Sequence, residues 1–313
     1  MAITFLFPGQ GAQYPGMGKD LFDSFQEVKD LFKAASDAVG YDVARVIFEG
    51  SEEELKQTDK TQIAVTLVNL ASAAALSARG IVPERCAGFS LGEYASLVAA
   101  GVIPLEQVFD VVRARGEIME AVSRTVDTPE GPAGMAAAIG LDFSSVAEVL
   151  KSVPDAYPGI YNSPSQTVVS GTAAGLTAAE GALKEAGVKR YIRLKVSGPF
   201  HSPLMAAARA EFEEVLSGVA FADPKVPVYS NVTGDIVKTG DEARTLCLDQ
   251  LVRTVLWTNE MESLVRDGAG AFLEVGPGTV LGGLWKAYAK TREGLDIPMY
   301  PAGKLEEIES VPA

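Results

Sequence analysis

The chain has 313 residues, 47% of them hydrophobic, and a net charge of −14 from 27 basic and 41 acidic residues. This length is sufficient for one large domain or two smaller ones with a sizeable core. Nucleic-acid binding is disfavoured because neutralising phosphates requires a basic surface. The sequence contains two cysteines and one histidine, so neither a disulfide framework nor a metal site is expected, and a reduced, cytoplasmic protein is indicated.

The first predicted element is a strand over residues 3–7, where β-branched and aromatic residues dominate. No basic region precedes it, so we do not expect a signal peptide. Pro8–Gln13 follows, and its two glycines allow either an ordinary turn or a close approach of the backbone to a ligand. Helices are predicted around Gly18–Ala38 and Thr61–Arg79. The apolar stretch Ile63–Leu76 is too short to cross a bilayer, so we expect a buried core helix and no membrane partner.

A short apolar strand is predicted at Arg85–Phe89 and a helix at Leu91–Ala100. Ser90 therefore lies on a sharp strand-to-helix turn, and Gly88 and Gly92 allow the strand and the helix to pass closely. This pattern is typical of a nucleophile elbow, which exposes the serine hydroxyl and places backbone N–H groups where an oxyanion develops. The pentapeptide also arises by chance, so its strand–turn–helix context carries the prediction.

The predicted helix Leu105–Ser123 has one apolar face, and Arg115 lies on that face. Arg113 belongs instead to the polar side. A guanidinium that faces the core is costly unless an anion meets it. Two interpretations remain open: an ion pair with an internal carboxylate, or a bidentate contact with the carboxylate of a substrate.

Residues 125–134 have the composition of a linker, and a compact pattern follows them. Strands are predicted at 134–140, 157–162, 166–170 and 189–196, with helices at 144–152 and 176–186. This order is that of a ferredoxin-like unit. We therefore expect a ferredoxin-like subdomain of residues 127–196, inserted into a larger α/β core formed by residues 1–126 and 197–313.

The last strand of this unit places four residues on one face: Lys189, Tyr191, Arg193 and Lys195. A basic face is unusual in so acidic a protein. A solvated surface is the simplest interpretation of it, and a docking surface is the alternative.

His201 is the single histidine and precedes Ser202-Pro203, which is a helix-start signal. The positive end of that helix dipole disfavours an imidazolium, so the imidazole is expected to be neutral and able to accept a proton. A lone histidine is often structural. In this chain, however, His201 is the one imidazole available to serve Ser90 as a general base.

The C-terminal third is predicted to contain a strand running into a turn at Pro227–Gly234 and a helix near Glu242–Arg253. Gln250 falls on the apolar stripe of that helix, where it either orients a site or serves packing. A further strand is predicted at Ala271–Val275, followed by a turn and a helix from about Thr279.

Taken in order, these motifs resemble malonyl-CoA:acyl carrier protein transacylases over essentially the whole chain. The residues that carry the resemblance are Phe7–Gln13, Gly88–Tyr94, Arg115-Gly116, Asn162–Pro164, Phe200-His201, Asn231, Gln250 and Glu274–Gly278. The resemblance implies an α/β-hydrolase-like core that carries the inserted subdomain. It also implies transfer of a malonyl group from malonyl-CoA to the phosphopantetheine thiol of acyl carrier protein, which supplies fatty-acid synthesis.

The implied reaction is a ping-pong acyl transfer through a malonyl-serine intermediate. Ser90 is the expected nucleophile and His201 the general base. The backbone N–H groups of Gln10 and Leu91 are expected to form the oxyanion hole. Arg115 is expected to hold the malonyl carboxylate, which explains an arginine on an apolar stripe.

The resemblance also implies supporting residues. A backbone carbonyl near Gln250 is expected to orient the imidazole, with Asn231 and Asn162 as further supporting residues. Phe200 resembles the bulky residue of malonyl-selective enzymes, and its ring is expected to crowd an α-methyl group. Phe89 departs from the family, which often has histidine before the nucleophile, so a changed pocket lining is expected.

Carrier proteins of this pathway are acidic as a family, so a local basic patch is expected on this acidic enzyme. The candidates are Lys189, Arg193 and Lys195, or else Lys286, Lys290 and Arg292. No cofactor or metal is implied, since malonyl-CoA is the substrate, and a monomer is expected. The sequence does not separate a fatty-acid carrier from a polyketide carrier.

Three other interpretations remain open. A serine hydrolase would require an acid between Ser90 and His201, and Asp127, Asp142 and Asp155 lie in that interval. Whether a carboxylate or a carbonyl faces the histidine distinguishes that hydrolase from the transferase. A polyketide-synthase acyltransferase would share the chemistry with a different carrier. A non-catalytic carrier-binding module is disfavoured because both the serine and the histidine are present.

Overall fold

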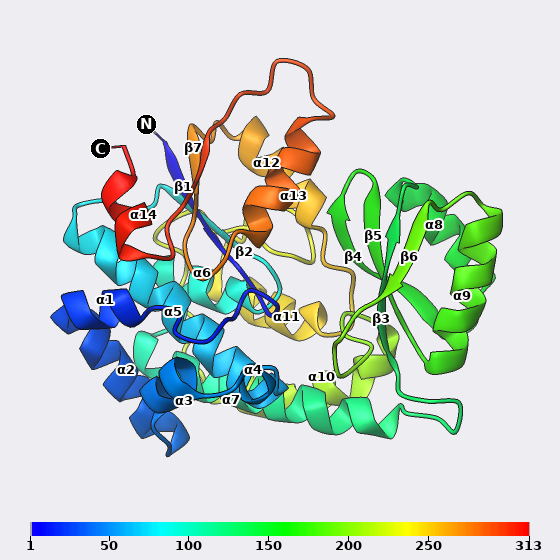
Figure 1. The fold of residues 1–313 in the computed structure, drawn as a ribbon, viewed down its shortest axis with the longest axis horizontal. Helices are drawn as coiled ribbons and strands as arrows, with labels where there is room; N and C mark the ends of the chain where they lie inside the picture. The colour runs from blue at the N-terminus through cyan, green and yellow to red at the C-terminus, as the bar shows by residue number, and fades with distance from the viewer. Residues whose placement is uncertain (1, 313) are drawn as a thin grey trace.

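The computed structural model describes residues 2–312 and contains one parallel and one antiparallel β-sheet, with helices around both (Figure 1). The parallel sheet has the strand order β2-β1-β7-β8. Its strands are β1 (Ile3–Phe7), β2 (Arg85–Gly88), β7 (Ala271–Glu274) and β8 (Met299–Pro301). Phe7 is in register with Gly88, and Leu6 with Glu274. The carboxyl ends of β1, β2 and β7 therefore meet at one edge, which is where ligands bind in sheets of this kind.

Helices surround the parallel sheet and share one apolar core with it. Before the antiparallel sheet they are α1 (Lys19–Ser24), α2 (Gln26–Val39), α3 (Val43–Glu49), α4 (Glu52–Leu55), α5 (Thr58–Ala78), α6 (Gly92–Ala99) and α7 (Leu105–Thr125). After it they are the 3-10 helix η1 (Pro203–Met205), α10 (Ala206–Ser217), α11 (Gly240–Gln250), α12 (Trp257–Arg266), α13 (Val280–Ala289) and α14 (Leu305–Ser310).

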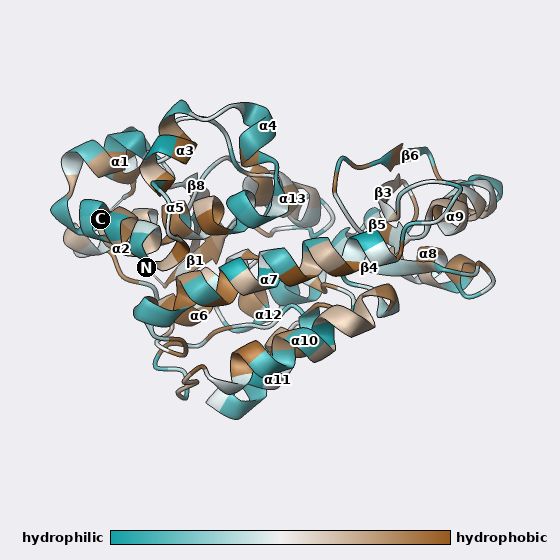
Figure 2. Ribbon diagram, turned by 90° about the horizontal axis from the view of Figure 1, so that it is seen from below, coloured by the Kyte–Doolittle hydropathy of each residue, from teal (hydrophilic) through white to brown (hydrophobic). Residues whose placement is uncertain are grey.

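The helix α5 is longer than the apolar stretch that the sequence indicated. At 21 residues it is, among the described residues, the one helix long and apolar enough to cross a membrane. However, 78% of its most apolar window is buried inside the protein, as expected for a core helix. On α7, hydrophobic and hydrophilic residues alternate along the ribbon (Figure 2). The buried side of α7 includes Arg115, whereas Arg113 is partly exposed and pairs with Asp110, on the polar side that the sequence predicted.

The antiparallel sheet has the strand order β4-β5-β3-β6. Its strands are β3 (Gly134–Ile139), β4 (Ala156–Ser163), β5 (Gln166–Gly171) and β6 (Arg190–Arg193), and its helices are α8 (Phe143–Leu150) and α9 (Ala173–Glu185). Both helices lie on the side of this sheet that faces away from the rest of the molecule (Figure 1). Val146, Leu176 and Leu183 form a separate small core there, while Met135 and Val168 on the opposite face join the main core.

Three elements differ from the sequence prediction. The helix predicted over 18–38 is two helices, because Phe25 is extended (φ −123°, ψ 132°) and the ring of Phe22 packs against Phe32 of α2 at 5.0 Å. No strand forms over 227–234; Val228 instead makes one isolated bridge to Cys86 at the edge of β2. The strand β6 is shorter than predicted, since its ladder with β3 ends at Arg193.

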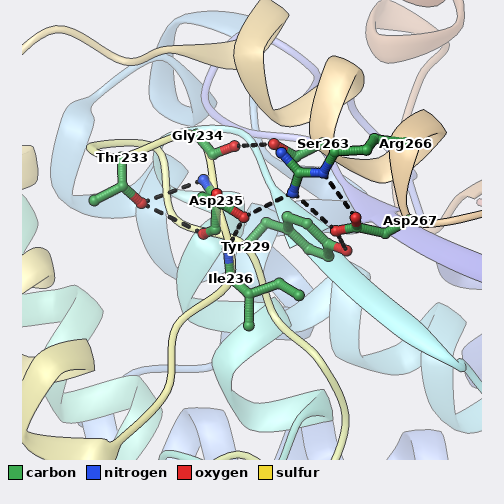
Figure 3. Close-up of polar contacts among 8 residues, drawn as sticks. All are labelled: Tyr229, Thr233, Gly234, Asp235, Ile236, Ser263, Arg266 and Asp267. Atoms are coloured by element: carbon green, nitrogen blue, oxygen red, sulfur yellow. Dashed lines mark hydrogen bonds and ion pairs between the residues drawn. The ribbon is translucent and has the colours of Figure 1, made fainter.

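A polar cluster fastens the end of α12 to the loop before α11 (Figure 3). The hydroxyl of buried Tyr229 donates to Asp267 at 2.8 Å, and the Arg266 guanidinium pairs with both Asp267 and Asp235. Arg85, at the start of β2, donates to the backbone carbonyl of Asp267 at 2.6 Å. This cluster lies where β2 begins, so it fixes the end of the sheet opposite to the carboxyl edge.

Candidate active site

Ser90 lies on the turn between β2 and α6 with φ 50°, in the left-handed region that non-glycine residues seldom adopt. The flanking glycines make this turn possible. A Cβ at Gly88 would collide with the backbone of Gly92, and a Cβ at Gly92 would collide with the carbonyl of Phe7. The close passage of strand and helix that the sequence indicated is therefore present, and it holds the serine at the carboxyl edge of the sheet.

The side chains of Ser90 and His201 are in hydrogen-bond contact, with 2.8 Å between Oγ and Nε2. The other ring nitrogen of His201, Nδ1, lies 2.7 Å from the backbone carbonyl oxygen of Gln250. A carbonyl only accepts, so Nδ1 carries the proton and Nε2 has a free lone pair toward the serine hydroxyl. This is the arrangement of a serine nucleophile with its general base.

His201 is 3% exposed, and burial lowers the pKa of its imidazole to about 4; the nearby Arg115 guanidinium also lowers it. The neutral imidazole agrees with the sequence prediction. A helix does begin at Pro203, where η1 runs directly into α10, although the Ser202 hydroxyl donates to the Pro199 carbonyl and does not cap the helix. Burial is the first cause of the low pKa, and Arg115 is the second.

A carbonyl, not a carboxylate, faces the histidine. The three acids in the interval between Ser90 and His201 have other partners or places. Asp127 accepts from the Ala133 backbone, Asp142 caps α8, and Asp155 lies at the turn before β4. The Ser–Asp–His arrangement of a hydrolase is therefore not formed by these residues.

Two backbone N–H groups lie at the elbow without a hydrogen bond to any described residue: those of Gln10 and Leu91. The loop that carries Gln10 is pressed onto the elbow. The Phe89 N–H donates to the Phe7 carbonyl at 2.9 Å, and a Cβ at Gly9 would collide with the Phe89 carbonyl. The two segments are thus adjacent, and the geometry leaves both donors for an oxyanion.

Arg115 is 1% exposed and has no carboxylate within 4.0 Å among the described residues. Its two terminal nitrogens donate to amide oxygens, Gln62 Oε1 and Gln250 Oε1, each at 2.9 Å, and its Nε has no partner. The guanidinium carbon also lies 5.3 Å from the centre of the Tyr94 ring. Of the two interpretations of this arginine, the direct internal ion pair is therefore wrong: the buried guanidinium contacts amide oxygens and no carboxylate among the described residues.

Asn231 and Gln250 hold the backbone of the elbow. Asn231 Oδ1 accepts from the Ser90 N–H at 2.7 Å, and its Nδ2 donates to the Gly88 carbonyl at 2.7 Å. Gln250 Nε2 donates to the Ser90 carbonyl at 3.0 Å. Both side chains are fully buried, so each polar atom they engage is satisfied inside the protein.

Three polar residues at this site were not predicted from the sequence. Glu93 and Glu260 are buried carboxyls, in contact with Gln250 and Asn231 respectively, and Gln62 holds Arg115. Burial raises the pKa of Glu93 to about 7 and raises that of Glu260 as well. Glu93 belongs to the Gly88–Tyr94 motif, so its position directly after the elbow could have marked it as a site residue. Nothing in the sequence around Gln62 or Glu260 marks either of them as part of the site.

Phe200, Phe89 and Asn162 are the other residues that the sequence placed at this site. Phe200 is buried next to the histidine, and its backbone carbonyl accepts from Ser170 at 2.5 Å. Phe89 contacts the Trp257 ring edge-on, with 5.3 Å between ring centres. Asn162, on β4, makes no hydrogen bond to the serine or the histidine, and its Oδ1 has no partner among the described residues.

A cavity of about 380 Å³ reaches His201 between the start of β4 and the loop after α11. Tyr157, Pro158 and Val232 contribute apolar walls. Arg253 is the charged residue of its lining and lies 3.7 Å from Asp249. The histidine is therefore accessible from the junction of the two sheets.

The proposed basic patches differ in availability. Arg193 donates to the Ala173 carbonyl and to the Thr177 hydroxyl, and Tyr191 packs into the small core, so this face of β6 is turned toward α9. Lys189 and Lys195 are exposed. On α13, Lys286 and Lys290 are exposed as well, one turn apart. Arg292 pairs with Glu262.

Residues 4–299 match the acyl transferase domain family, which fits an elbow serine paired with a histidine. The chain is 41% identical over 289 residues to the malonyl CoA-acyl carrier protein transacylase of Bacillus subtilis, covering 91% of this chain and 89% of that protein. The solved acyl carrier protein S-malonyltransferase of Vibrio cholerae superposes with a TM-score of 0.93 at 33% identity and complete coverage of both chains.

A solved complex of a type II PKS acyl-carrier protein with its malonyl-transacylase matches with a TM-score of 0.91 at 36% identity, covering 99% of this chain and 98% of that one. The chain therefore belongs to the malonyl CoA-acyl carrier protein transacylase family of acyl transferase domains.

Proposed function

We propose that this protein transfers the malonyl group of malonyl-CoA to the phosphopantetheine thiol of an acyl carrier protein and so supplies fatty-acid synthesis. The observation that carries the proposal is the pairing of Ser90 with His201 beside a buried Arg115 that has no carboxylate in direct contact. A hydrolase of neutral esters has no use for such an arginine. The names of the relatives, and the solved complex of a relative with its carrier, support the same reaction.

In the first half-reaction, Ser90 Oγ attacks the thioester carbon while His201 Nε2 accepts the hydroxyl proton. The C–S bond then breaks, the proton passes to the departing CoA sulfur, and a malonyl ester remains on the serine. The N–H groups of Gln10 and Leu91 stabilise the oxyanion of the tetrahedral intermediate. Arg115 receives the malonyl carboxylate in a bidentate pair.

In the second half-reaction, the carrier thiol gives its proton to His201 and attacks the ester carbon. The serine oxygen leaves and takes the proton back from the imidazole. The Gln250 carbonyl keeps the imidazole in one tautomer through both steps. Only side chains, backbone donors, the malonyl thioester and the carrier thiol take part, so the proposed reaction requires no cofactor.

We also propose the finer description of the fold. Residues 1–126 and 197–313 form an α/β-hydrolase-like core, and residues 127–196 form a ferredoxin-like subdomain. The element order β3-α8-β4-β5-α9-β6 and the strand order β4-β5-β3-β6 support the second part. The monomeric state and the cytoplasmic location stay predictions, and Asn162 stays a supporting residue without an assigned contact.

The burial of Phe200, the residue directly before the histidine, supports selection of malonyl over methylmalonyl groups. One methyl group in an apolar pocket is worth about 1–3 kcal/mol, so we propose a preference and not a strict exclusion. A polyketide carrier in place of a fatty-acid carrier would leave every step above unchanged.

Intact-protein mass spectrometry tests the proposal directly. After brief incubation with malonyl-CoA, the protein gains one malonyl group, the Ser90→Ala variant gains none, and added acyl carrier protein takes the group over. Loss of the malonyl group to water at the same rate with or without carrier would instead establish a hydrolase. Absence of any adduct and of CoA release would overturn both enzymatic functions for this substrate.

A further inference from the structure

Glu93 has no part in the reaction described above, although it lies three residues after the nucleophile. Its side chain is 1% exposed. The carboxylate accepts a hydrogen bond from Gln250 Nε2. A buried carboxyl at this position is costly unless the site uses its charge or keeps it neutral.

The amide of Gln250 lies between this carboxyl and the guanidinium of Arg115. Its Oε1 accepts from Arg115 at 2.9 Å, and its Nε2 donates to Glu93. An amide has one accepting and one donating end, so the two bonds fix its orientation and align its dipole between a cation and an acid. No direct contact within 4.0 Å joins Arg115 to Glu93 or to any other described carboxylate.

We propose that Glu93 is the internal counter-charge of Arg115 and takes up a proton when the carboxylate of the acyl group binds to Arg115. Glu93 thereby becomes a residue that determines the specificity for carboxylated acyl groups and makes their loading dependent on pH. The inference rests on the proposed function, because it requires a malonyl carboxylate at Arg115.

The charges around Glu93 support this assignment. Arg115 on α7 is the cation that faces it, while Cys247 on α11, Glu260 on α12 and Tyr94 on its own helix are the other titratable groups. Burial raises the pKa of all three of these groups, and the charge of Glu93 raises that of Glu260 further, so each is displaced toward its uncharged form. Arg115 is therefore the one of these groups whose charge favours ionised Glu93.

Burial also raises the pKa of Glu93 to about 7, against the lowering effect of its hydrogen bonds and of Arg115. A malonyl carboxylate at Arg115 offsets the positive charge that favours ionised Glu93, so its pKa rises further. Below pH 7 the acid is already protonated and Arg115 is free to bind the carboxylate. Above pH 7 the ionised acid competes with the acyl carboxylate for the same cation.

The consequence is a pH-dependent affinity that only a charged acyl group experiences. If loading raises the pKa of Glu93 by one unit, the half-saturating malonyl-CoA concentration is roughly fivefold higher at pH 8 than at pH 6. Acetyl-CoA has no acyl carboxylate and is not affected. His201, with a pKa of about 4, does not titrate in this range.

The test measures single-turnover acylation of Ser90 from pH 6 to pH 8 in the wild-type protein and in Glu93→Gln. Half-saturating concentrations are determined for malonyl-CoA, and for acetyl-CoA either as donor or as inhibitor of malonyl loading. Titrations of the CoA moiety cancel in the ratio of the two concentrations. We expect this ratio to rise roughly fivefold with pH in the wild type and to stay flat in the variant.

Glu274→Gln is the matched control. Glu274 is also a buried carboxyl whose pKa burial raises to about 7, but it accepts from the Leu281 and Gly282 N–H groups at the start of α13. This variant should keep the wild-type pH dependence. An equal pH dependence in Glu93→Gln and the wild type would overturn the inference.

The wild-type protein alone also decides the question if Glu93→Gln does not fold. A malonyl-to-acetyl ratio that is flat from pH 6 to pH 8 contradicts proton uptake by Glu93, while malonyl-serine formation in the same samples keeps the proposed function intact. Absence of malonyl-serine at every pH would instead remove the proposed function itself.

Discussion

The side-chain oxygen of Asn231 accepts a hydrogen bond from the backbone N–H of Ser90 at 2.7 Å, across 141 positions of sequence. The same amide donates to the carbonyl of Gly88, so it holds the backbone of the elbow at Gly88 as well as at the strained Ser90. A serine with φ 50° costs on the order of 1–3 kcal/mol relative to a relaxed backbone. The buried amide offsets this cost and fixes the direction of the nucleophile.

Replacing Asn231 with alanine is expected to slow malonyl-serine formation and to lower the free energy of unfolding by about 2 kcal/mol, because two buried backbone groups lose their partner. Rapid-quench measurement of malonyl-serine formation gives the first effect, and chemical denaturation gives the second. Thr233→Ala is the control, since its hydroxyl bonds only to the backbone of Asp235 in the same loop. An acylation rate equal to that of the wild type would show that the elbow keeps its geometry without this amide.

The pH profile of acylation is expected to remain near its maximum down to about pH 5. Burial lowers the pKa of His201 to about 4, so the imidazole stays neutral and able to accept the serine proton until the pH falls to that value. Activity is therefore lost as the pH drops through 4, not through the ordinary histidine range. Rapid-quench acylation with acetyl-CoA, which avoids the carboxylate at Arg115, checks this; a midpoint near 6.5 would contradict it.

Arg115→Ala is expected to reduce kcat/KM for malonyl-CoA by roughly 100-fold or more, because a buried charge-assisted pair to a carboxylate is worth about 3 kcal/mol. The rate with acetyl-CoA should fall far less, so the preference between the two donors shrinks or reverses. Arg113→Ala, on the exposed side of the same helix, is the control. Equal losses with both donors would assign Arg115 a structural role.

Charge reversal is expected to identify the carrier surface. The double variants Lys189→Glu/Lys195→Glu and Lys286→Glu/Lys290→Glu each remove two exposed cations. Reversal in the true patch should raise the KM for acyl carrier protein roughly tenfold and leave malonyl loading unchanged, since complementary charges act on association.

The control for charge reversal is Lys33→Glu on α2, a helix on the opposite side of the molecule from the antiparallel sheet (Figure 1). An unchanged carrier KM in both double variants would refute docking at either patch.

Tyr229→Phe is expected to lower the free energy of unfolding by roughly 1–2 kcal/mol, because Asp267 loses a buried hydrogen-bond donor (Figure 3). Malonyl loading should be unaffected, since this cluster lies at the other end of the sheet from Ser90. Urea unfolding monitored by tryptophan fluorescence measures the change. A loss of loading in the folded variant would show that the two ends of the sheet are coupled.

The sequence allowed prediction of the elements whose signals are local. Residue patterns and turn residues located the strands of both sheets except β8 (Met299–Pro301), and the glycines around Ser90 indicated the elbow that the structure contains. Arg115 was identified because a charged residue on the apolar face of a helix is unusual. Such a residue can be recognised from the helix pattern alone, without knowing which residue or ligand it contacts.

The features that could not be predicted depend on contacts between segments that are far apart in the sequence. Gln62, Glu93 and Glu260 contact the site from three different helices, and no local pattern marks a polar residue as the partner of another one 29 to 157 positions away. Burial is the first cause of the low pKa of His201, and it had no local signal because it depends on the whole fold. The break at Phe25 likewise reflects tertiary packing, not a helix-breaking residue.

The carbonyl of Phe200 is bonded to Ser170 on β5, and the imidazole of the next residue, His201, is bonded to the Gln250 carbonyl at the end of α11. The short segment that carries the general base is therefore held by the antiparallel sheet at one residue and by the main core at the next, whereas the nucleophile follows a strand of the parallel sheet. The serine–histidine separation is consequently set by how these parts of the protein pack together, and not by the local sequence around either residue.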